Sequence, residues 1–262
     1  DVMLKSGEYT FKKPHTMGEV ILILSKGQFI PLRVTVKDGK TLDEIRDFLV
    51  DNYGFKQDRL EQAFQNTDLI SDMDSEAQDL EGYILPETYF VRKNISEKEL
   101  VKIIVGKFKD VFTPKLKMQV RDMGYSFREI IILASLIEKE TSLESERRLV
   151  SSVYHNRLKK KMLLQCDPTM IYALKKAGIY NKMKWKKRGR KIDSPYNTYK
   201  YPGLPPGPIC NPSRKSLIAA VHPEQTEFLY FVRKKRGERE HYFSKSYKEH
   251  RWAIRKSLRG WK

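Results

Sequence analysis

The fold of this chain is decided by residues 126–142, which read SFREIIILASLIEKETS. Ser126 and Glu129 have the spacing of a capping box, which marks the start of a helix. Apolar residues then recur at the spacing of one helix face, at Ile130, Leu133, Ala134 and Ile137. We therefore predict a buried helix from about Phe127 to Ser142 and place the rest of the chain around it.

The last turn of this helix carries the carboxyl group of greatest interest. At about 100° per residue, Glu140 falls seven residues after Leu133 and three after Ile137, so it continues the buried face. Glu138 lies well off the centre of that face. A carboxyl group in apolar surroundings has a raised pKa and can donate a proton near neutral pH. The alternative is that Glu140 forms an ion pair with an arginine such as Arg157.

The following segment predicts a second helix, whose apolar face consists of Leu149, Val150, Val153, Tyr154 and Leu158. Glu146 lies on the same face one turn before Val150, and Arg157 lies on it one turn after Val153. Polar groups on a buried face must be paired. We therefore expect a structural interaction between Glu146 and Arg157.

Residues 1–52 alternate strand and helix signals. Residues 8–12 have the pattern of a short strand, and alternating apolar residues within 28–37 predict a second, half-buried strand. Capping boxes that begin at Thr16 and Thr41 predict two helices. We therefore predict a compact β-α-β-α module, which is either a small packing domain or a module that binds carbohydrate or a partner.

The remainder is predicted to be an irregular connecting region, residues 53–79, and a mostly helical domain, residues 80–262. Further helix starts are predicted from capping boxes and from Asp-Pro and Asn-Pro pairs, at Ser96, Ser246, Asp167 and Asn211. Gly178 should end one of these helices. Residues 227–233 and 240–244 flank a glycine-containing turn and predict a hairpin. The fold class is therefore α+β, with a small N-terminal α/β module before a mostly helical domain that contains a small antiparallel sheet.

The chain is strongly basic. Its 262 residues include 51 Lys and Arg against 33 Asp and Glu, a formal net charge of +18. Such a surface attracts polyanions, which include nucleic acid, anionic lipid and anionic cell-wall polymers. We interpret the basic runs at 184–191 and 233–239 as solvated loops. Aromatic residues do not interleave these runs as a nucleic-acid stacking platform requires, so nucleic acid is the weakest of the three partners.

Two features bear on the cellular location of the chain. No apolar stretch approaches the roughly 18 residues that span a bilayer. The sequence begins at Asp1 without an initiator methionine, so we interpret it as a processed or truncated product from which any signal or anchor has been removed.

Metal and nucleotide chemistry find no support in the sequence. Cys166 and Cys210 are too few for a disulfide framework, and no Cys/His cluster has zinc spacing. Glycine-rich phosphate-binding motifs are also absent. We predict that the protein uses no metal and no other cofactor. The two cysteines flank motif loops, so we expect them to lie near enough to crosslink, without a catalytic role.

Many motifs resemble one family. The segment LASLIEKET at 133–141 resembles the signature of the endolytic murein transglycosylases, or YceG-like family. The resemblance runs in order over nearly the whole chain, through LEGYILPETY (80–89), VYHNRL (153–158), LQCDPT (164–169), YNTY (196–199) and GLPPGPI (203–209). In that family the catalytic glutamate directly precedes the threonine. The resemblance therefore implies that Glu140 is the catalytic residue, which is the same residue that the helical pattern turns inward.

The resemblance also implies a setting for the protein. It implies a LysM-like N-terminal region, an N-terminal membrane anchor that this chain lacks, and a catalytic domain outside the cytoplasmic membrane. The expected partners are peptidoglycan glycan strands and peptidoglycan synthases, because the family terminates the growth of nascent strands. Nucleic acid is not an expected partner.

The implied reaction is lytic. Glu140 would protonate the oxygen that links N-acetylmuramic acid to N-acetylglucosamine, and would then accept the proton of the muramic acid 6-hydroxyl as that oxygen attacks C1. The product would be a 1,6-anhydro end. One carboxyl group suffices because the nucleophile is part of the substrate, so proximity replaces an activated water.

Candidate substrate-binding residues share aromatic faces or amide groups that suit sugar rings and N-acetyl groups, and they are Tyr196, Asn197, Thr198, Tyr199 and Gln165. The alternative for the four loop residues is that they only pack the loop. Asp167 is explained as a helix cap and is a weaker candidate.

Two other functions stay open. A hydrolytic muramidase would need a second carboxylate beside Glu140, for which the candidates are Glu81, Glu87 and Glu146. A non-catalytic scaffold of the cell-wall machinery would keep the fold and would not need Glu140.

Overall fold

The computed structural model describes residues 3–27, 30–181, 189–235 and 237–259. The elements that precede the central helix are α1 (Met17–Lys26), β1 (Leu32–Thr35), α2 (Leu42–Tyr53), α3 (Gln57–Phe64), the 3-10 helix η1 (Thr67–Ile70), β2 (Thr88–Val91), α4 (Glu97–Val111) and α5 (Pro114–Asp122). The central helix and the elements after it are α6 (Phe127–Glu140), α7 (Glu144–Lys159), α8 (Asp167–Lys176), α10 (Arg214–Val221), β3 (Tyr230–Arg233), β4 (His241–Ser244) and α11 (Tyr247–Arg259). Most of the predicted basic run at 184–191 lies outside the described residues.

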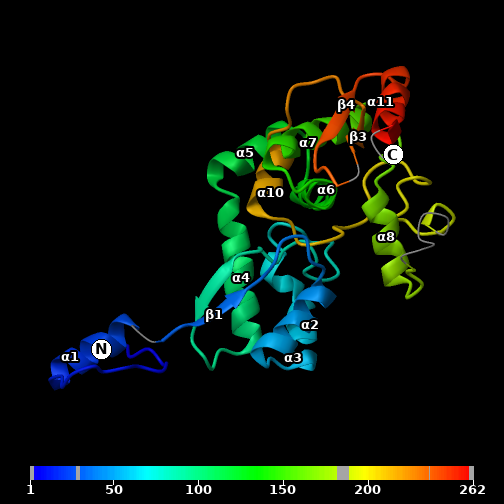
Figure 1. Cartoon of the computed structure of the whole chain (residues 1–262). Helices are drawn as coiled ribbons and strands as arrows, with labels where there is room; N and C mark the ends of the chain where they lie inside the picture. Colours follow the sequence, from blue (N-terminus) through cyan, green and yellow to red (C-terminus); the bar gives the residue numbers. More distant parts are fainter. Residues whose placement is uncertain (1–2, 28–29, 182–188, 236, 260–262) are drawn as a thin grey trace.

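The predicted central helix is confirmed as α6. Residues 130–137 are all buried, and α6 crosses the middle of the main body with α7, α8 and α10 around it (Figure 1). The predicted capping boxes are also confirmed at the N-termini of α1, α2, α4 and α6, where Thr16, Thr41, Ser96 and Ser126 each accept a bond from the third helical residue. The hairpin is confirmed as β3 paired antiparallel with β4.

The N-terminal module differs from the prediction. Residues 8–12 form no strand, and β1 pairs antiparallel with β2, so that Leu32 lies opposite Val91 and Thr35 opposite Thr88. The strand of the predicted β-α-β-α unit therefore pairs with a strand outside that unit, and a LysM-like module is not confirmed. We missed β2 because its four residues sit at the end of a motif whose apolar residues continue without alternation. The division of the chain at residues 52 and 79 stays a prediction.

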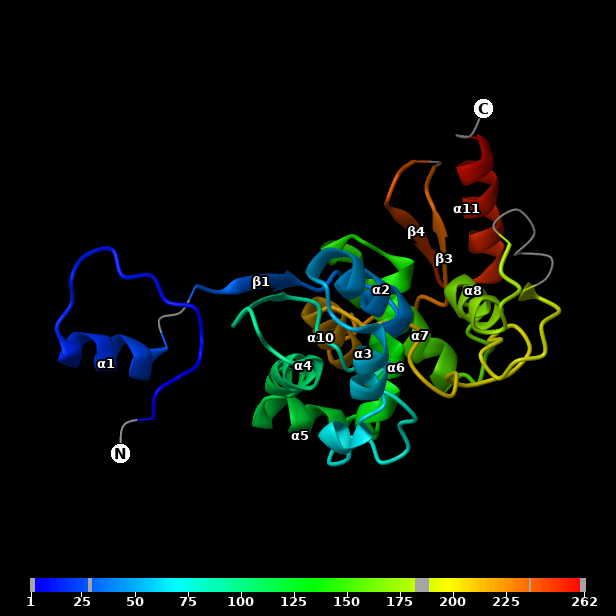
Figure 2. The same ribbon diagram turned by 90° about the horizontal axis from the view of Figure 1, so that it is seen from below.

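Two other segments show how the module joins the body. α1 has no buried residue and lies apart from the other helices in both views (Figures 1 and 2). α3 occupies part of the region predicted to be irregular, because Leu60, Ala63 and Phe64 bury one face against α2 and α4. One core of buried side chains extends from Val34 in β1 to Val221 in α10. None of the described helices is long and apolar enough to cross a membrane.

Asn211 was predicted to start a helix, but it instead holds two distant segments of the chain together through hydrogen bonds. α10 begins at Arg214 and is capped by Ser213, whose side chain accepts a bond from Ser216. The Asn211 side chain is fully buried, and its Oδ1 accepts bonds from the backbone N–H groups of Gly82 and Ile84, both at 2.9 Å. Its Nδ2 donates to the Glu81 carboxyl at 2.8 Å and to the Lys40 carbonyl at 3.0 Å.

Asn211→Ala should lower the free energy of unfolding by about 2–4 kcal/mol, because two buried backbone donors lose their acceptor. Urea denaturation followed by circular dichroism measures this. Asn52→Ala is the matched control, since the exposed Asn52 side chain makes one bond to the Phe48 carbonyl. That control should stay within about 0.5 kcal/mol of wild type. An Asn211→Ala protein as stable as the control would contradict the role assigned to Asn211.

Candidate active site

Glu140 is the last residue of α6, and its side chain is half-buried as the sequence predicted. Its Oε1 accepts a hydrogen bond from the Tyr154 hydroxyl at 3.1 Å and another from the Cys166 thiol at 3.1 Å. Tyr154 comes from α7, and Cys166 caps α8. The carboxyl group is therefore held where three elements meet, and the alternative of an ion pair with Arg157 is wrong.

Burial raises the pKa of Glu140. The bonds from Cys166 and Tyr154 stabilise the ionised form and lower the pKa in part, while the nearby Asp167 carboxylate raises it again. Burial outweighs the two donors because both are neutral groups and no cation within the described ranges pairs with Glu140. The result is a carboxyl group whose protonated form persists to a higher pH than an exposed glutamate would allow.

The two donors also determine which oxygen carries the proton. The thiol and the hydroxyl are themselves buried, which raises the pKa of both, so each keeps its hydrogen and remains a donor. Because both bonds end on Oε1, a proton on the carboxyl group belongs on Oε2. No residue in the described part of the chain hydrogen-bonds to that oxygen. Oε2 is therefore the atom that can exchange a proton with a bound molecule.

Cys166 has a fixed position. Its backbone N–H donates to the Thr198 hydroxyl at 3.0 Å, and its carbonyl accepts from the Thr169 hydroxyl at 2.7 Å. The preceding residue, Gln165, has a φ of 51°, an uncommon conformation for a residue other than glycine. The sequence predicted no catalytic role for Cys166, and its contact with Glu140 was not expected.

The predicted substrate-binding loop contributes to the site mainly by building it. Asn197 is fully buried, and its Nδ2 donates to the carbonyls of Gly189 and Ile192 at 3.2 and 2.9 Å. Thr198 is also buried, with its hydroxyl on Cys166. Tyr196 packs against Tyr172, with ring centroids 4.9 Å apart.

Tyr199 and Gln165 lie nearer to solvent than Asn197 and Thr198. The Tyr199 hydroxyl donates to Asp167 at 2.7 Å, and Gln165 is exposed beside Cys166. We predicted that Asp167 caps α8. Asp167 is instead the first residue of α8, and Cys166 occupies the cap position.

The expected pair of Glu146 and Arg157 does not form. Glu146 is buried and bonds instead to His241 of β4, from both the backbone N–H and Nδ1 at 2.7 Å. Arg157 donates to the carbonyls of Leu163, Leu164 and Leu229. Sequence reasoning missed His241 because its partner lies 95 residues away. The charge of His241 is also one of the causes that lower the pKa of Glu140.

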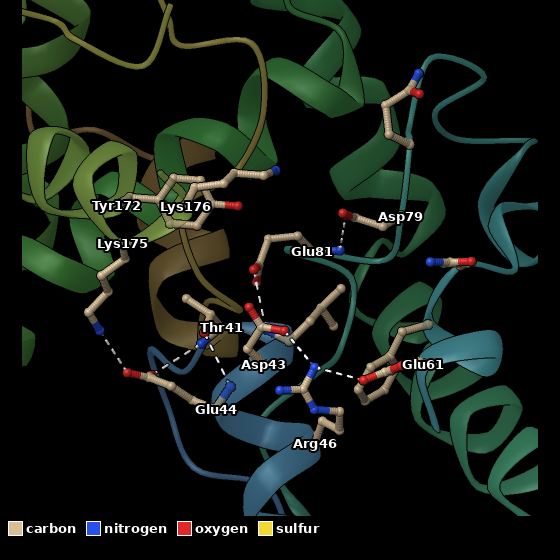
Figure 3. Close-up of a pocket in the computed structure, with 14 residues that line it drawn as sticks. Thr41, Asp43, Glu44, Arg46, Glu61, Asp79, Glu81, Tyr172, Lys175 and Lys176 are labelled. Carbon is tan, nitrogen blue, oxygen red and sulfur yellow. Dashed lines mark hydrogen bonds and ion pairs between the residues drawn. The ribbon is translucent and has the colours of Figure 1, made fainter. Parts of the chain in front are cut away.

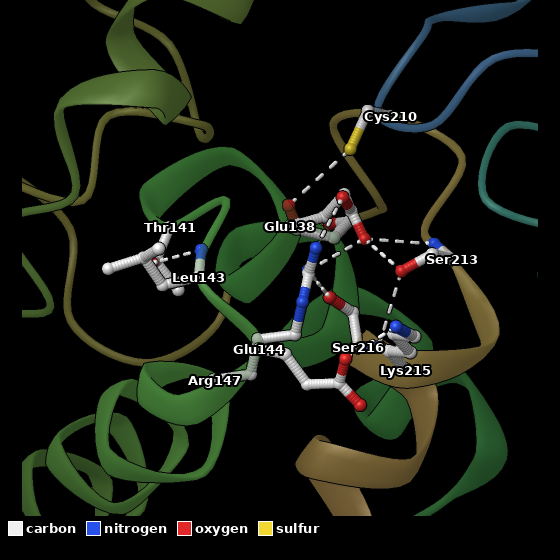
Figure 4. Close-up of polar contacts among 10 residues, drawn as sticks. Glu138, Thr141, Leu143, Glu144, Arg147, Cys210, Ser213, Lys215 and Ser216 are labelled. Atoms are coloured by element: carbon white, nitrogen blue, oxygen red, sulfur yellow. Dashed lines mark hydrogen bonds and ion pairs between the residues drawn. The ribbon is translucent and has the colours of Figure 1, made fainter. Parts of the chain in front are cut away.

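Glu138 is more buried than its place on the helical wheel predicted, with 5% of its side chain exposed. It pairs with Arg147 at 3.0 Å and accepts bonds from the Ser213 hydroxyl and backbone N–H (Figure 4). Burial alone would raise the pKa of Glu138, but the Ser213 bonds and the Arg147 charge outweigh it and lower that pKa. Glu138 therefore stays ionised and joins α6 to α7 and α10.

The remaining carboxylates of interest are engaged elsewhere. Glu81 bonds to Asn211 and to the Leu42 N–H, and burial raises its pKa to about 8. Glu87 lies 3.6 Å from Arg214. Neither of them, nor Glu146, contacts Glu140 in the described part of the chain.

Cys210 lies on a different side of α6 from Cys166. Its thiol donates to the Ser135 carbonyl at 3.4 Å, and both cysteines are free and buried. Ser135 and Glu140 are about 140° apart around the helix axis. The contacts therefore do not support the expectation that the two thiols lie near enough to crosslink.

The comparisons with known proteins identify the family of this chain. The YceG-like family matches residues 1–256. This chain belongs to the YceG-like family. It is 33% identical to the endolytic murein transglycosylase of Bacillus subtilis, an alignment that covers 97% of this chain and 73% of that protein. It is 28% identical to the endolytic murein transglycosylase of Streptococcus pneumoniae D39, over 87% of this chain and 46% of that protein.

The fold of the YceG-like family also matches. The crystal structure of a putative YceG-like protein from Listeria monocytogenes superposes with a TM-score of 0.73 at 30% identity, covering 95% of this chain and 84% of that chain. The mixed helical architecture with small antiparallel sheets is therefore shared with a solved relative.

The raised pKa of Glu140 predicts how stability depends on pH. Above the ordinary value of 4.5 the unfolded chain loses this proton first, so ionising Glu140 costs stability as the pH rises towards the pKa of the folded state. Glu140→Gln removes that cost, so its melting temperature minus that of wild type should increase from pH 4.5 to pH 8. The exposed Glu144, paired with Lys215, provides the control Glu144→Gln, whose difference should not increase. A difference for Glu140→Gln that is constant with pH would refute the raised pKa.

Proposed function

We propose that the protein is an endolytic peptidoglycan lytic transglycosylase that cuts between N-acetylmuramic acid and N-acetylglucosamine and leaves 1,6-anhydro ends. The observation that carries this proposal is a single half-buried carboxyl group with one oxygen held by two donors and the other without a partner among the described residues. The names of the curated relatives support the same class of reaction.

The proposed mechanism uses both protonation states of Glu140. The proton on Oε2 passes to the glycosidic oxygen as the bond from that oxygen to C1 of the muramic acid breaks. The carboxylate that remains then accepts the proton of the 6-hydroxyl while O6 forms a bond to C1. Tyr154 and Cys166 stabilise this carboxylate through Oε1, and the returning proton restores the starting state on Oε2.

Two rival functions are weaker on these contacts. A hydrolytic muramidase needs a second carboxylate free to activate water. Glu81, Glu87 and Glu146 are each bonded to other groups, as described above. A scaffold would have no need of a carboxyl group whose burial opposes stability at neutral pH.

We further propose that the protein acts outside the cytoplasmic membrane on nascent strands, alongside peptidoglycan synthases.

Glu140→Gln should reduce anhydro-muropeptide formation by roughly 10²–10⁴-fold, because an amide cannot transfer the proton. The assay is a digest of purified peptidoglycan analysed by chromatography and mass spectrometry. Glu144→Gln should retain activity, since its carboxylate is exposed and lies outside the site. Glu138→Gln should lose stability through Arg147 and keep its activity per folded molecule. Equal product yields from Glu140→Gln and wild type would exclude this mechanism.

Cys166 should set the alkaline limb of the pH–rate profile, where the Glu140 acid becomes ionised. Cys166→Ala removes a donor to the carboxylate, which raises the pKa of Glu140 and moves the limb to higher pH. Cys166→Ser supplies a stronger donor and should move it to lower pH. Cys210→Ala, which deletes the other buried thiol, should leave the limb in place. Identical profiles for the two Cys166 variants would show that the thiol does not act on Glu140.

A further inference from the structure

The outer face of α11 carries a stripe of cations around an exposed tryptophan. Trp252 is 55% exposed, although tryptophan is highly buried on average. At about 100° per residue, three cations lie within about 60° of Trp252 around the helix axis and a fourth lies beside them. All four are exposed. We call these residues the α11 stripe, and they are Lys248, Arg251, Trp252, Arg255 and Lys256.

The cations of the α11 stripe are not neutralised by neighbouring carboxylates. None of them forms an ion pair in the described part of the chain, and the nearest pairs in sequence involve other lysines. The basic residues around α2 show the contrast (Figure 3). Arg46 pairs there with Asp43 and Glu61, and Lys175 pairs with Glu44. Like charges one turn apart destabilise a helix, so an anionic partner of the α11 stripe would remove that cost.

Aromatic rings and a cation are combined at one end of the α11 stripe. The rings of Trp252 and of Tyr242 in β4 have centroids 6.5 Å apart. The Nζ atom of Lys256 lies 4.9 Å from the Tyr242 ring centroid and 5.0 Å from that of Trp252. Aromatic faces suit sugar rings, and ammonium groups bind carboxylates through charge-assisted hydrogen bonds. The combination fits a polymer that carries both sugars and carboxylates.

The apolar face of α11 is used within the protein. His250 stacks on Tyr230 of β3 with ring centroids 5.0 Å apart, and Ala253 and Ser257 on the same side of the helix are buried. A helix that lies in a membrane interface inserts its apolar face into the lipid. The face of α11 that would do so packs on the hairpin instead. An anionic polymer therefore fits the α11 stripe better than a lipid surface does.

The hairpin connects the α11 stripe to the candidate active site. α11 lies beside β3 and β4 in both views (Figures 1 and 2). Tyr242 contributes to the lining of a hollow of about 510 Å³, and so does Leu143, in the turn that follows Glu140. The hollow thus reaches from the end of α6 to the ring that packs on Trp252.

We propose that the α11 stripe binds the same peptidoglycan strand that Glu140 cleaves, at sugars remote from the cleaved bond. The inference rests on the proposed function and adds a strand-binding surface to it. The cations of the stripe bind free carboxylates of the stem peptides, and Trp252 stacks on a sugar ring. Contacts remote from the cleaved bond require a long strand, so the stripe favours attack within strands over attack on short fragments.

The test measures binding to insoluble peptidoglycan freed of teichoic acid and lipid, by co-sedimentation. Every protein carries Glu140→Gln, so that the strands stay intact, and this single variant is the parent. The double variant Lys248→Gln/Lys256→Gln should bind about fivefold to tenfold more weakly than the parent, because it loses two exposed ion pairs. The matched control is Lys98→Gln/Lys102→Gln, which makes the same change of charge at exposed positions on α4. That control should stay within about twofold of the parent, because salt screens distant charges.

A second peptidoglycan preparation identifies the group that is bound. The free amines of both preparations are acetylated, and the carboxylates of one are then converted to methylamides. This conversion should weaken binding of the parent by about fivefold to tenfold and have little effect on Lys248→Gln/Lys256→Gln, because both changes remove the same contact. Trp252→Ala should weaken binding to both preparations by a similar factor, because stacking on a sugar ring needs no carboxylate.

Equal binding by the two double variants would overturn the inference. A parent protein that leaves peptidoglycan unbound and binds vesicles of phosphatidylglycerol would also overturn it, because the stripe would then be a membrane contact. Digestion of the same peptidoglycan by wild type distinguishes this failure from that of the proposed function. Anhydro products together with equal binding by the double variants overturn the inference alone, whereas absence of anhydro products refutes the proposed function.

Discussion

The burial of α6 is the constraint on which the rest of the structure depends. Residues 130–137 are buried without interruption, so the helix must be covered on every side. α7, α8 and α10 provide that cover, although α10 begins more than seventy residues after α6 ends. A helix with such surroundings carries any side chain on its last turn into a setting of low polarity. The position of Glu140 at that end follows directly.

Two glutamates on this last turn show how neighbouring groups decide the role of a carboxyl group. Glu138 is buried beside Arg147 and Ser213, which keep it ionised, and it joins three helices. Glu140 meets only neutral donors, from Tyr154 and Cys166, so burial raises its pKa. The ionised form of Glu140 costs stability, and the same cost makes it an effective acid. A cation beside Glu140 would stabilise the ionised carboxylate and lower its pKa, so Glu140 would no longer be protonated and could not act as an acid.

The sequence predicted the features that depend on local spacing. The capping boxes, the buried face of α6 and the inward position of Glu140 all follow from residues within one or two helical turns of each other. The predictions that were wrong concern contacts between residues far apart in the sequence. β1 pairs with β2, which lies more than fifty residues later. Glu146 pairs with His241, and Asn211 accepts a bond from Gly82, which lies 129 residues earlier. The contact between Cys166 and Glu140 could not be predicted because it exists only once α8 has packed against α6.

The most direct test of the central claim is to digest peptidoglycan in water enriched in heavy oxygen and to measure the masses of the new muramic acid ends. If the 6-hydroxyl of the substrate is the nucleophile, the ends are 1,6-anhydro sugars and contain no heavy oxygen from the solvent. Wild type should give such anhydro ends, and Glu140→Gln should not. Ends heavier by one water, with solvent oxygen at C1, would show hydrolysis and contradict the lytic mechanism.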